Sequence, residues 1–312
     1  AAIAIDEPFP ESKAHYSPKG IASKLVACAN DKLIQAEQLG LFDAYLIKKS
    51  RMFPTLLARL PIFLPGPASR QKHLLDDDLS YPFATPFGRG RRFGPPVNIE
   101  DEEILFAMLR LSEKRLIGNG HNLPIPLDGG DLWLKDEKSG RVTVQVAMAT
   151  IGQINAEAGL VKAGNNYKNT LASVKRLNQI SIELETRKQE MYLGESWNGD
   201  KIRLVDIKWK AYQQEGLIYA QFTPIMVKWL KEQATYYNWE IRRKLTTSNG
   251  RALHRFLSTQ GQSYTAPLSY IADTIEWYGD RMRLRPRMES VLKDLRDNHD
   301  WCDFEITGKG RV

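Results

Sequence analysis

One order of predicted elements occurs twice along this chain, and it constrains the fold more than any single motif does. The first half reads as helix, strand, helix, turn, helix and then strands that alternate apolar and polar residues. The second half repeats helix, strand, helix, turn and helix, and then ends on a strand and the basic tip Gly308–Arg311. This order is typical of a helix-turn-helix with an added β-hairpin, so the sequence predicts two tandem winged helices.

Hydrophobic periodicity and turn residues set the bounds of the two units, which we take as residues 97–232 and 233–312. In the first unit we expect a helix at 98–115, capped by Asn98, and a strand at Val142–Val146. A helix at Thr150–Leu160, a turn at Gly164–Asn166 and a helix at Tyr167–Asn178 should follow. Three strands, at Ile180–Arg187, Lys201–Lys208 and Leu217–Phe222, complete the unit. In the second we expect a helix, a strand, a helix, a turn, a helix and a strand, at 247–260, Ser263–Ala266, Leu268–Trp277, Tyr278–Asp280, 281–298 and Trp301–Thr307.

Two further segments precede these units. Residues 1–50 are predicted to be a helical region, because apolar residues recur at helical spacing between Pro18 and Ser50. Residues 51–96 are rich in proline and glycine and predict a connector with a short strand near Pro61–Leu64, not a packed helical unit. The predicted fold class is therefore α+β, with a helical N-terminal segment, a Pro/Gly-rich connector and two tandem winged-helix domains.

The last predicted helix begins with a cluster of arginines. Arg281, Arg283, Arg285 and Arg287 stand at its start and Lys293 lies two turns further on, while apolar residues at Met288, Val291, Leu292 and Leu295 follow helical spacing. Proline at position 286 suits a first turn, where a missing N–H costs nothing. A docked apolar face beneath an exposed arginine-rich end is what a DNA recognition helix needs. The alternative is an amphipathic helix with a solvated basic face.

The corresponding helix of the first unit carries a different polar set. Asn165, Asn166, Tyr167 and Lys168 stand at its start, and Lys175 lies further along. Asparagine can read adenine and lysine can hold phosphate. The alternative is that Asn165 or Asn166 caps the helix. At the chain end, Lys309 and Arg311 are predicted to form a wing tip that contacts DNA.

The N-terminal region contains the peptide Gln38-Leu39-Gly40-Leu41-Phe42. It resembles the QLxLF peptide by which bacterial proteins bind the DNA-polymerase sliding clamp. Leu41 and Phe42 would fill an apolar pocket, and Gln38 would form a hydrogen bond at its rim. The alternative is that Leu39, Leu41 and Phe42 belong to an amphipathic helix packed on this chain.

Composition and missing motifs narrow the function classes. The formal net charge of +7 favours a polyanionic partner, and Cys28 and Cys302 are too far apart in sequence for a CxxC motif, which fits a reducing cytoplasm. The sequence has no apolar run long enough to span a membrane, no GxxxxGK[ST] and no His-x-His. We therefore expect a cytoplasmic, non-enzymatic protein without a cofactor or a metal. Tyr236-Tyr237 and His254 are interpreted as packing residues, not catalytic ones.

From Asn98 to Val312 the chain resembles plasmid replication initiators of the TrfA type and, more distantly, the RepC type. The segments that carry the resemblance are IEDEEILFAMLRLSEKR, NNYKNTLASVKRLNQISIELET, LIYAQFTPIMVKWL, SNGRALHRFLSTQGQSYTAPLSYIADTI and RLRPRMESVLKDLRDN. The TrfA type also carries a QLSLF-like clamp peptide near its N-terminus, which matches Gln38–Phe42 with glycine in place of serine. The chain departs from the pattern in its Pro/Gly/Arg-rich connector and in Pro286.

The resemblance implies a function. Such initiators bind repeated origin sequences, called iterons, in double-stranded DNA; the second winged helix is the main reader and the first makes further DNA and subunit contacts. They promote opening of an adjacent A·T-rich region and recruit the host replicative helicase, the chromosomal initiator and the sliding clamp. Self-association is left open, and no membrane partner is expected. The alternatives are a winged-helix transcriptional regulator, a plasmid partition protein or a DNA-nicking initiator.

Overall fold

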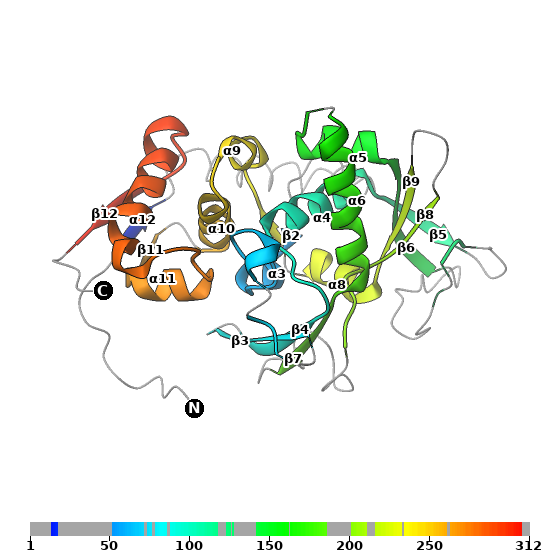
Figure 1. Cartoon of the computed structure of the whole chain (residues 1–312), viewed down its shortest axis with the longest axis horizontal. Coiled ribbons are helices and arrows are strands. Elements are labelled where there is room, and N and C mark those ends of the chain that lie inside the picture. The colour runs from blue at the N-terminus through cyan, green and yellow to red at the C-terminus, as the bar shows by residue number, and fades with distance from the viewer. Residues whose placement is uncertain are drawn as a thin grey trace, which may run out of the picture.

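The chain is an α+β protein in which several small sheets are interleaved with helices (Figure 1). The computed structural model describes residues 52–71, 74–76, 79–85, 88–117, 123–125, 127, 142–161, 163–185, 201–210, 216–232, 234–260 and 263–307, and the backbone of 14–17. The predicted N-terminal helix, the clamp-like peptide Gln38–Phe42 and the wing tip Gly308–Arg311 lie outside these residues.

Both predicted units contain their expected helices. The elements before residue 233 are β1 (Ala14–Ser17), β2 (Met52–Pro54), α3 (Thr55–Arg59), η1 (Ala68–Arg70), β3 (Ser80–Thr85), β4 (Gly88–Phe93), α4 (Ile99–Leu111), β5 (Glu113–Ile117), β6 (Val142–Thr150), α5 (Ile151–Ala158), α6 (Gly164–Gln179), β7 (Ser181–Glu185), β8 (Val205–Lys210), β9 (Leu217–Phe222) and α8 (Pro224–Glu232). After it follow β10 (Ala234–Tyr236), α9 (Trp239–Lys244), α10 (Ser248–Leu257), β11 (Tyr264–Ala266), α11 (Leu268–Thr274), the 3-10 turn η4 (Arg281–Arg283), α12 (Leu284–Lys293), the π-helical turn η5 (Asp294–Asn298) and β12 (Asp303–Ile306).

The first unit is built on an antiparallel sheet in the order β5-β6-β9-β8. Alternate residues of β6 and β9, such as Ala147 and Ala220, are buried in the main core, which α4, α5 and α6 share. The last strand, β9, lies between β6 and β8, so the chain inserts its final strand into the middle of the sheet. The predicted strand at Ile180–Arg187 is different: it forms β7, which pairs with β4 outside this sheet.

The second unit has a three-stranded sheet in the order β11-β1-β12. Its central strand comes from the N-terminal region: Ala14 of β1 lies opposite Ala266 of β11 on one side and Ile306 of β12 on the other. Both pairings are antiparallel. Thus β1, which is more than two hundred residues from β11 and β12 in sequence, lies beside β12. The predicted β-hairpin would need its second strand at this position.

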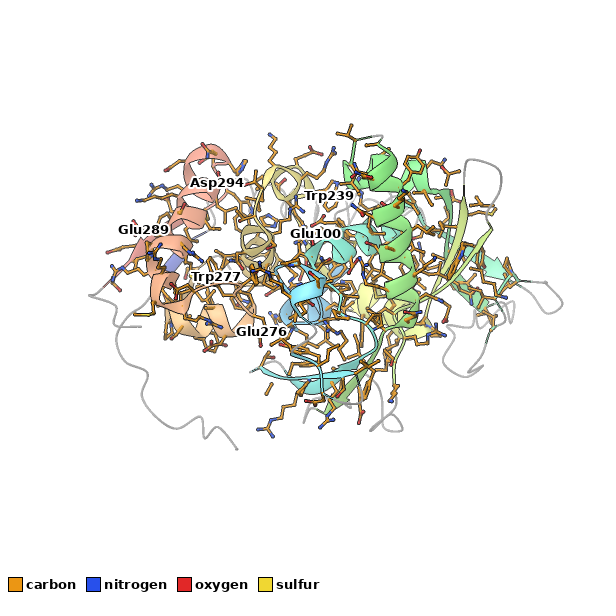
Figure 2. All side chains as sticks on the ribbon, viewed as in Figure 1. Glu100, Trp239, Glu276, Trp277, Glu289 and Asp294 are labelled. Carbon is orange, nitrogen blue, oxygen red and sulfur yellow. The ribbon has the colours of Figure 1, made fainter. Side chains whose placement is uncertain are left out.

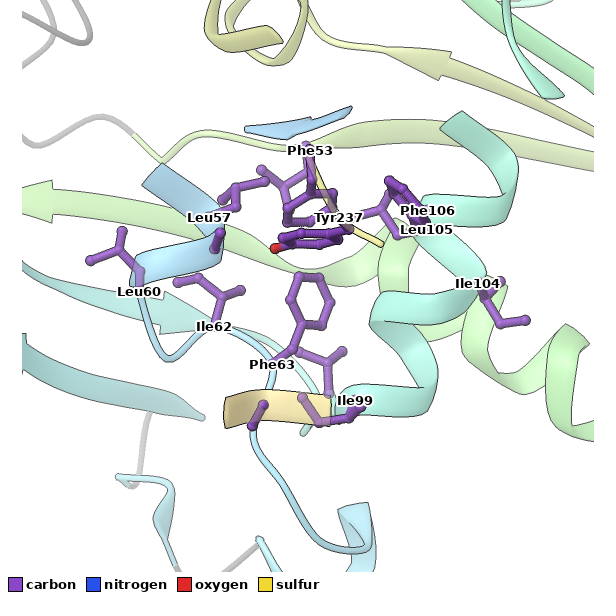
Figure 3. Close-up of a cluster of buried hydrophobic side chains, with 14 of the residues drawn as sticks. Phe53, Leu57, Leu60, Ile62, Phe63, Ile99, Ile104, Leu105, Phe106 and Tyr237 are labelled. Carbon is purple, nitrogen blue, oxygen red and sulfur yellow. The ribbon is translucent and has the colours of Figure 1, made fainter. Parts of the chain in front are cut away.

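Residues 51–96, predicted to be a connector and not a packed helical unit, contribute side chains to the core and strands to two sheets. Phe53, Leu57 and Phe63 are fully buried, β2 pairs with β10, and β4 pairs with β7 (Figure 3). The expected strand at Pro61–Leu64 is instead a turn with one parallel bridge, from Leu64 to Asn98. The prolines and glycines mark tight turns and close contacts, not an absence of packing: a Cβ on Gly90 would lie 2.1 Å from the Glu183 carbonyl oxygen of β7.

An aromatic cluster joins the connector to both units. The Phe53 ring stacks on Tyr237 at 5.6 Å between centroids, and Phe106 of α4 contacts Tyr237 at 5.8 Å and Trp239 of α9 at 4.8 Å. Figure 3 shows Phe53, Tyr237 and Phe106 side by side beside α4. Such pairs contribute about 0.5–1.5 kcal/mol each beyond the area that they bury. Tyr237 is therefore a packing residue, as predicted.

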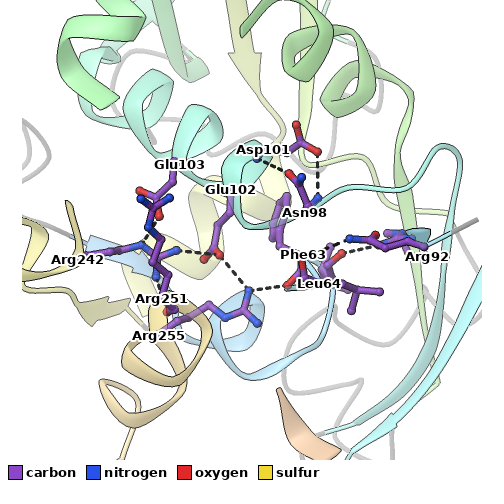
Figure 4. Close-up of polar contacts among 12 residues, drawn as sticks. Phe63, Leu64, Arg92, Asn98, Asp101, Glu102, Glu103, Arg242, Arg251 and Arg255 are labelled. Carbon is purple, nitrogen blue, oxygen red and sulfur yellow. Dashed lines mark hydrogen bonds and ion pairs between the residues drawn. The ribbon is translucent and has the colours of Figure 1, made fainter. Parts of the chain in front are cut away.

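The first turn of α4 holds the two units together through three consecutive acids (Figure 4). Asn98 and Asp101 form the capping box that begins the helix, as the predicted cap required, and Asp101 also accepts two hydrogen bonds from Arg176 of α6. The next two acids point toward the second unit. Glu103 accepts from Arg242 at 2.6 Å, and Glu102 accepts from both Arg242 and Arg255 at 3.0 Å.

This ion cluster is almost completely buried. The side chains of Arg242 and Arg255 are each 1% exposed, and that of Glu102 is 2% exposed. Burial would lower the pKa of Arg242, but Glu102 and Glu103 outweigh burial and hold that pKa above its ordinary value. Arg242 therefore remains charged, and the positions of both arginines depend on the carboxylates of α4.

His254 of α10 lies next to this cluster without a hydrogen bond to either ring nitrogen within the described residues. Its ring packs 4.4 Å from the Trp301 ring. Burial, followed by the charges of Arg242 and His299, holds the pKa of His254 well below its ordinary value. The ring is neutral in the folded protein and has a packing role, as predicted.

Replacing Arg242 with alanine should lower the free energy of unfolding by about 3–5 kcal/mol, because Glu102 and Glu103 would stay buried without their shared partner. The matched control is Arg243→Ala, since Arg243 is the next residue and its side chain is exposed. That change should cost less than about 0.5 kcal/mol. Urea denaturation followed by tryptophan fluorescence measures both, and equal losses would contradict the role given to the cluster.

Stability should also fall with pH below about 6.5, the ordinary pKa of histidine. The unfolded chain takes up a proton at residue 254 there, whereas the folded chain does not, so His254 removes about 1.4 kcal/mol of stability per pH unit until its folded pKa is reached. Thermal unfolding of the wild type and His254→Gln at pH 7.5 and 5.5 isolates this contribution. The variant should lose less stability on acidification than the wild type does. Identical pH profiles for the wild type and His254→Gln would show that residue 254 does not titrate differently in the two states.

Candidate nucleic-acid interface

The helix pair α5–α6 presents the polar residues predicted for the first unit. Thr150 and Gln153 form a capping box at the start of α5, and Gly159 ends it with a left-handed φ of 74°. The inner face of α6 is buried through Thr170, Ser173, Val174 and Leu177. Its remaining faces are free to carry exposed side chains, and the predicted turn at Gly164–Asn166 is the first turn of this helix.

The predicted reading residues of α6 divide into two groups. Asn165, Lys168 and Lys175 are exposed, and their side chains make no hydrogen bond or ion pair with any described residue. The other two have structural contacts. Asn166 donates from Nδ2 to the Val161 carbonyl oxygen at 2.8 Å, and Tyr167 is half-buried against the core. Neither asparagine caps the helix, because the N-cap is Ala163.

The helix pair α11–α12 presents the arginines predicted for the second unit. Asp280 caps the 3-10 turn η4, and α12 then buries Leu284, Met288 and Leu292. Of the predicted apolar face, Met288, Leu292 and Leu295 are buried and Val291 is half-buried. Pro286 lies in the first turn, where its missing N–H leaves no hydrogen bond unmade. Figure 2 shows Glu289 and Asp294 along α12 and its continuation, at the end of the molecule farthest from the four-stranded sheet.

The arginines of this second unit differ in their surroundings. Arg283 and Arg287 are exposed, and Arg287 lies against Gly279, where a Cβ would stand 2.6 Å from its Nη1. Arg281 is paired with Asp273 at 2.8 Å, and Arg285 is half-buried and already has an interaction. Lys293 is exposed and paired with Glu289 at 2.9 Å. Arg283 and Arg287 are therefore the two arginines most available to a ligand.

The turn between α11 and α12 is supported by the segment that was predicted to be a connector. Asn249 of α10 forms two hydrogen bonds with the backbone of Tyr278. Its Nδ2 donates to the Tyr278 carbonyl oxygen at 2.8 Å, and its Oδ1 accepts from the Tyr278 N–H at 2.9 Å. Arg70 donates to the Tyr278 hydroxyl at 2.9 Å. Glu276 has a left-handed φ of 53°. Burial raises the pKa of its carboxyl group, and the hydrogen bond from Tyr81 of β3 opposes that rise. Tertiary contacts therefore hold this turn in place.

Sequence reasoning missed two cations on α9. Arg243 and Lys244 are exposed, and neither side chain bonds to a described residue. Arg243 lies across the turn after α5, since a Cβ on Gly159 would stand 2.3 Å from its Nε. Figure 1 shows α9 between the two helix pairs. The sequence Arg242-Arg243-Lys244 gave no means to tell which of these cations is buried.

Other kinds of site were also sought in the described part of the chain. No group of three or more His, Cys, Asp or Glu residues there has the arrangement needed to hold a metal ion. None of the helices described is long and apolar enough to cross a membrane. The residues Gln38, Leu39, Leu41, Phe42, Lys309 and Arg311 lie outside the described part, so their predicted roles stay predictions.

Comparison with known proteins assigns no family. No family model matches the chain, and no curated protein matches it. The structure is similar to the crystal structure of selenomethionine derivatives of domains 2 and 3 of RctB, with 13% sequence identity and a TM-score of 0.49. The similar region covers 78% of this chain and 86% of that one. A likeness at this level identifies neither the fold family nor the function.

Proposed function

We propose that the chain is a non-enzymatic initiator of plasmid DNA replication that binds repeated origin sequences in duplex DNA. In this proposal both units are winged helices, and each places one helix, α6 in the first and α12 in the second, in a major groove. Assembly on the repeats strains an adjacent A·T-rich region, whose deformable steps lower the cost of opening. The host replicative helicase, the chromosomal initiator and the sliding clamp then join the opened DNA.

The observation that carries the proposal is the pairing of buried and exposed faces on α6 and α12. Each helix follows a short helix and a turn, buries one apolar face and exposes cations that have no protein partner among the described residues. Cations left without an acidic partner are suited to bind phosphates. The exposed amide of Asn165 and the guanidinium groups of Arg283 and Arg287 have the donors needed to read base edges.

The sheet topology supports the winged-helix interpretation of the first unit. The chain runs from β6 through α5 and α6 to β7, which pairs with β4 outside this sheet, and then to the hairpin β8–β9, where β9 returns to pair with β6. This is the order of a helix-turn-helix followed by a wing. In the second unit, β11 and β12 have the corresponding places, and β1 lies between them.

The connection between the units supports a single binding surface. Asp101 is bonded to α6, whereas Glu102 and Glu103 are bonded to α9 and α10, so three adjacent residues of α4 contact both units. Arg243 and Lys244 belong to α9, which lies between the helix pairs (Figure 1), and neither side chain has a partner in the part of the chain that the structure describes. We assign them phosphate contacts between the two grooves, which would make the protein bind one continuous stretch of duplex.

Removing exposed lysines from α6 should weaken DNA binding without unfolding the protein. The change Lys168→Ala with Lys175→Ala should reduce the slope of log affinity against log salt concentration by about two units, one for each lost phosphate contact. Fluorescence anisotropy with a 40-base-pair duplex of mixed sequence measures the slope. The control Lys228→Ala with Lys231→Ala removes the same charge from α8 and should leave the slope within about half a unit of the wild type. Equal effects of the two pairs would contradict a DNA contact by α6.

The clamp peptide separates an initiator from a transcriptional regulator or partition protein that binds DNA in the same way. A peptide spanning Ala36–Asp43 should bind a bacterial sliding clamp in the roughly micromolar range. In the whole protein, Leu41→Ala with Phe42→Ala should abolish clamp binding and leave DNA binding unchanged, as measured by surface plasmon resonance on each ligand. If the double variant unfolds or loses DNA binding, these residues belong to the protein core and the clamp proposal falls.

Nicks in supercoiled DNA after incubation with Mg²⁺ would favour a nicking initiator.

A further inference from the structure

Two apolar side chains are unusually exposed, and they stand immediately before α6 and α12, the two proposed recognition helices. Among the side chains that the structure describes, Met282 is 89% exposed and Val161 is 76% exposed, more than any other large apolar residue. Val161 lies in the turn before α6, and Met282 lies in the 3-10 turn before α12. The two units differ in sequence at these turns, yet each places an apolar side chain in water at the same point.

The backbone of each residue is held by a neighbouring polar side chain. The Val161 carbonyl oxygen accepts a hydrogen bond from Nδ2 of Asn166, at 2.8 Å. The Met282 N–H donates to Oδ1 of Asp280, at 2.9 Å. The two turns are therefore ordered while their apolar side chains remain outside the core. A backbone that is already ordered loses little further conformational entropy when a ligand covers its side chain.

The surroundings of these residues indicate the kind of ligand. Met282 lies between Arg281 and Arg283, and Arg283 is exposed without an acidic partner among the described residues. In the first unit, the exposed Lys168 lies one turn into the helix that follows Val161. An apolar protein surface would have to desolvate these cations, at considerable cost. Duplex DNA offers negative phosphates together with one apolar group in its major groove, the C5-methyl of thymine.

We infer that Val161 and Met282 contact thymine methyl groups, at the equivalent place in each half of the DNA site. The inference rests on the proposed function, because it requires α6 and α12 to enter major grooves. It adds a sequence preference that cations alone do not give: a thymine beside the start of each recognition helix. Asn166 and Asp280 then act as positioning residues for the two apolar contacts.

Uracil in place of thymine tests the inference, because it removes the methyl group and keeps every hydrogen-bonding group of the base. The probe is a duplex enriched from a random-sequence pool by the wild-type protein and synthesised with thymine or with uracil. Burying one methyl group contributes about a fourfold factor in affinity, so two contacts should make the wild type bind the uracil duplex about sixteenfold more weakly. Val161→Ala with Met282→Ala should bind the thymine duplex more weakly and show less than about a twofold further loss on uracil.

Met148→Ala is the matched control, because Met148 is 55% exposed but lies on β6, away from both turns. This variant should keep the full uracil effect. An equal uracil effect in the wild type and the double variant would overturn the inference, as would a wild type that binds both duplexes equally. Either result leaves DNA binding itself intact. If the wild-type protein enriches no duplex from the pool, the proposed function fails as well.

Discussion

The buried ion cluster on the first turn of α4 is the interaction on which the arrangement of both units depends. Arg242 and Arg255 come from the second unit, yet their charges are balanced by Glu102 and Glu103 of the first. A buried charge without its partner is costly, so the two units cannot separate without exposing or neutralising these groups. The cluster gives the pair a defined relative position, which aromatic packing around Tyr237 alone would not specify.

The same helix also relates the cluster to the candidate interface. Asp101 is the first of these three acids and is bonded to Arg176 of α6, on the helix that exposes Lys168 and Lys175. Adjacent positions on α6 therefore have different roles: Arg176 anchors the helix, and Lys175 remains available to a ligand. On α9 the division is the same, with Arg242 buried and Arg243 exposed. Because some cations are paired inside the protein and their neighbours in sequence are exposed, the net charge of +7 is concentrated on particular parts of the surface.

Local patterns predicted the helices of both units well. The cap at Asn98 and the apolar faces of α4 and α12 follow from side-chain spacing and local hydrogen bonding, which are properties of short segments. The packing of the connector could not be predicted, because its burial depends on partners far away in sequence, such as β10 for β2 and β7 for β4. Proline and glycine content indicated turns correctly but could not show that Phe53 and Phe63 fill the core between them.

The candidate site was less predictable than the fold. Charge counts identified Arg281, Arg283, Arg285 and Arg287 as equivalent, whereas tertiary contacts leave Arg283 and Arg287 the most available. No sequence signal distinguished Arg243 from Arg242, or revealed that Val161 and Met282 remain exposed. Each of these differences depends on which side chains of another segment lie nearby, and periodicity within one segment carries no information about that.

Hydroxyl-radical footprinting on a duplex enriched by the wild-type protein tests most directly whether both helix pairs bind one continuous site. We predict two protected tracts about one helical turn apart, or a multiple of it. Lys168→Ala with Lys175→Ala should weaken protection of one tract, and Arg283→Ala with Arg287→Ala should weaken protection of the other. A single tract that neither pair of changes affects would contradict the account.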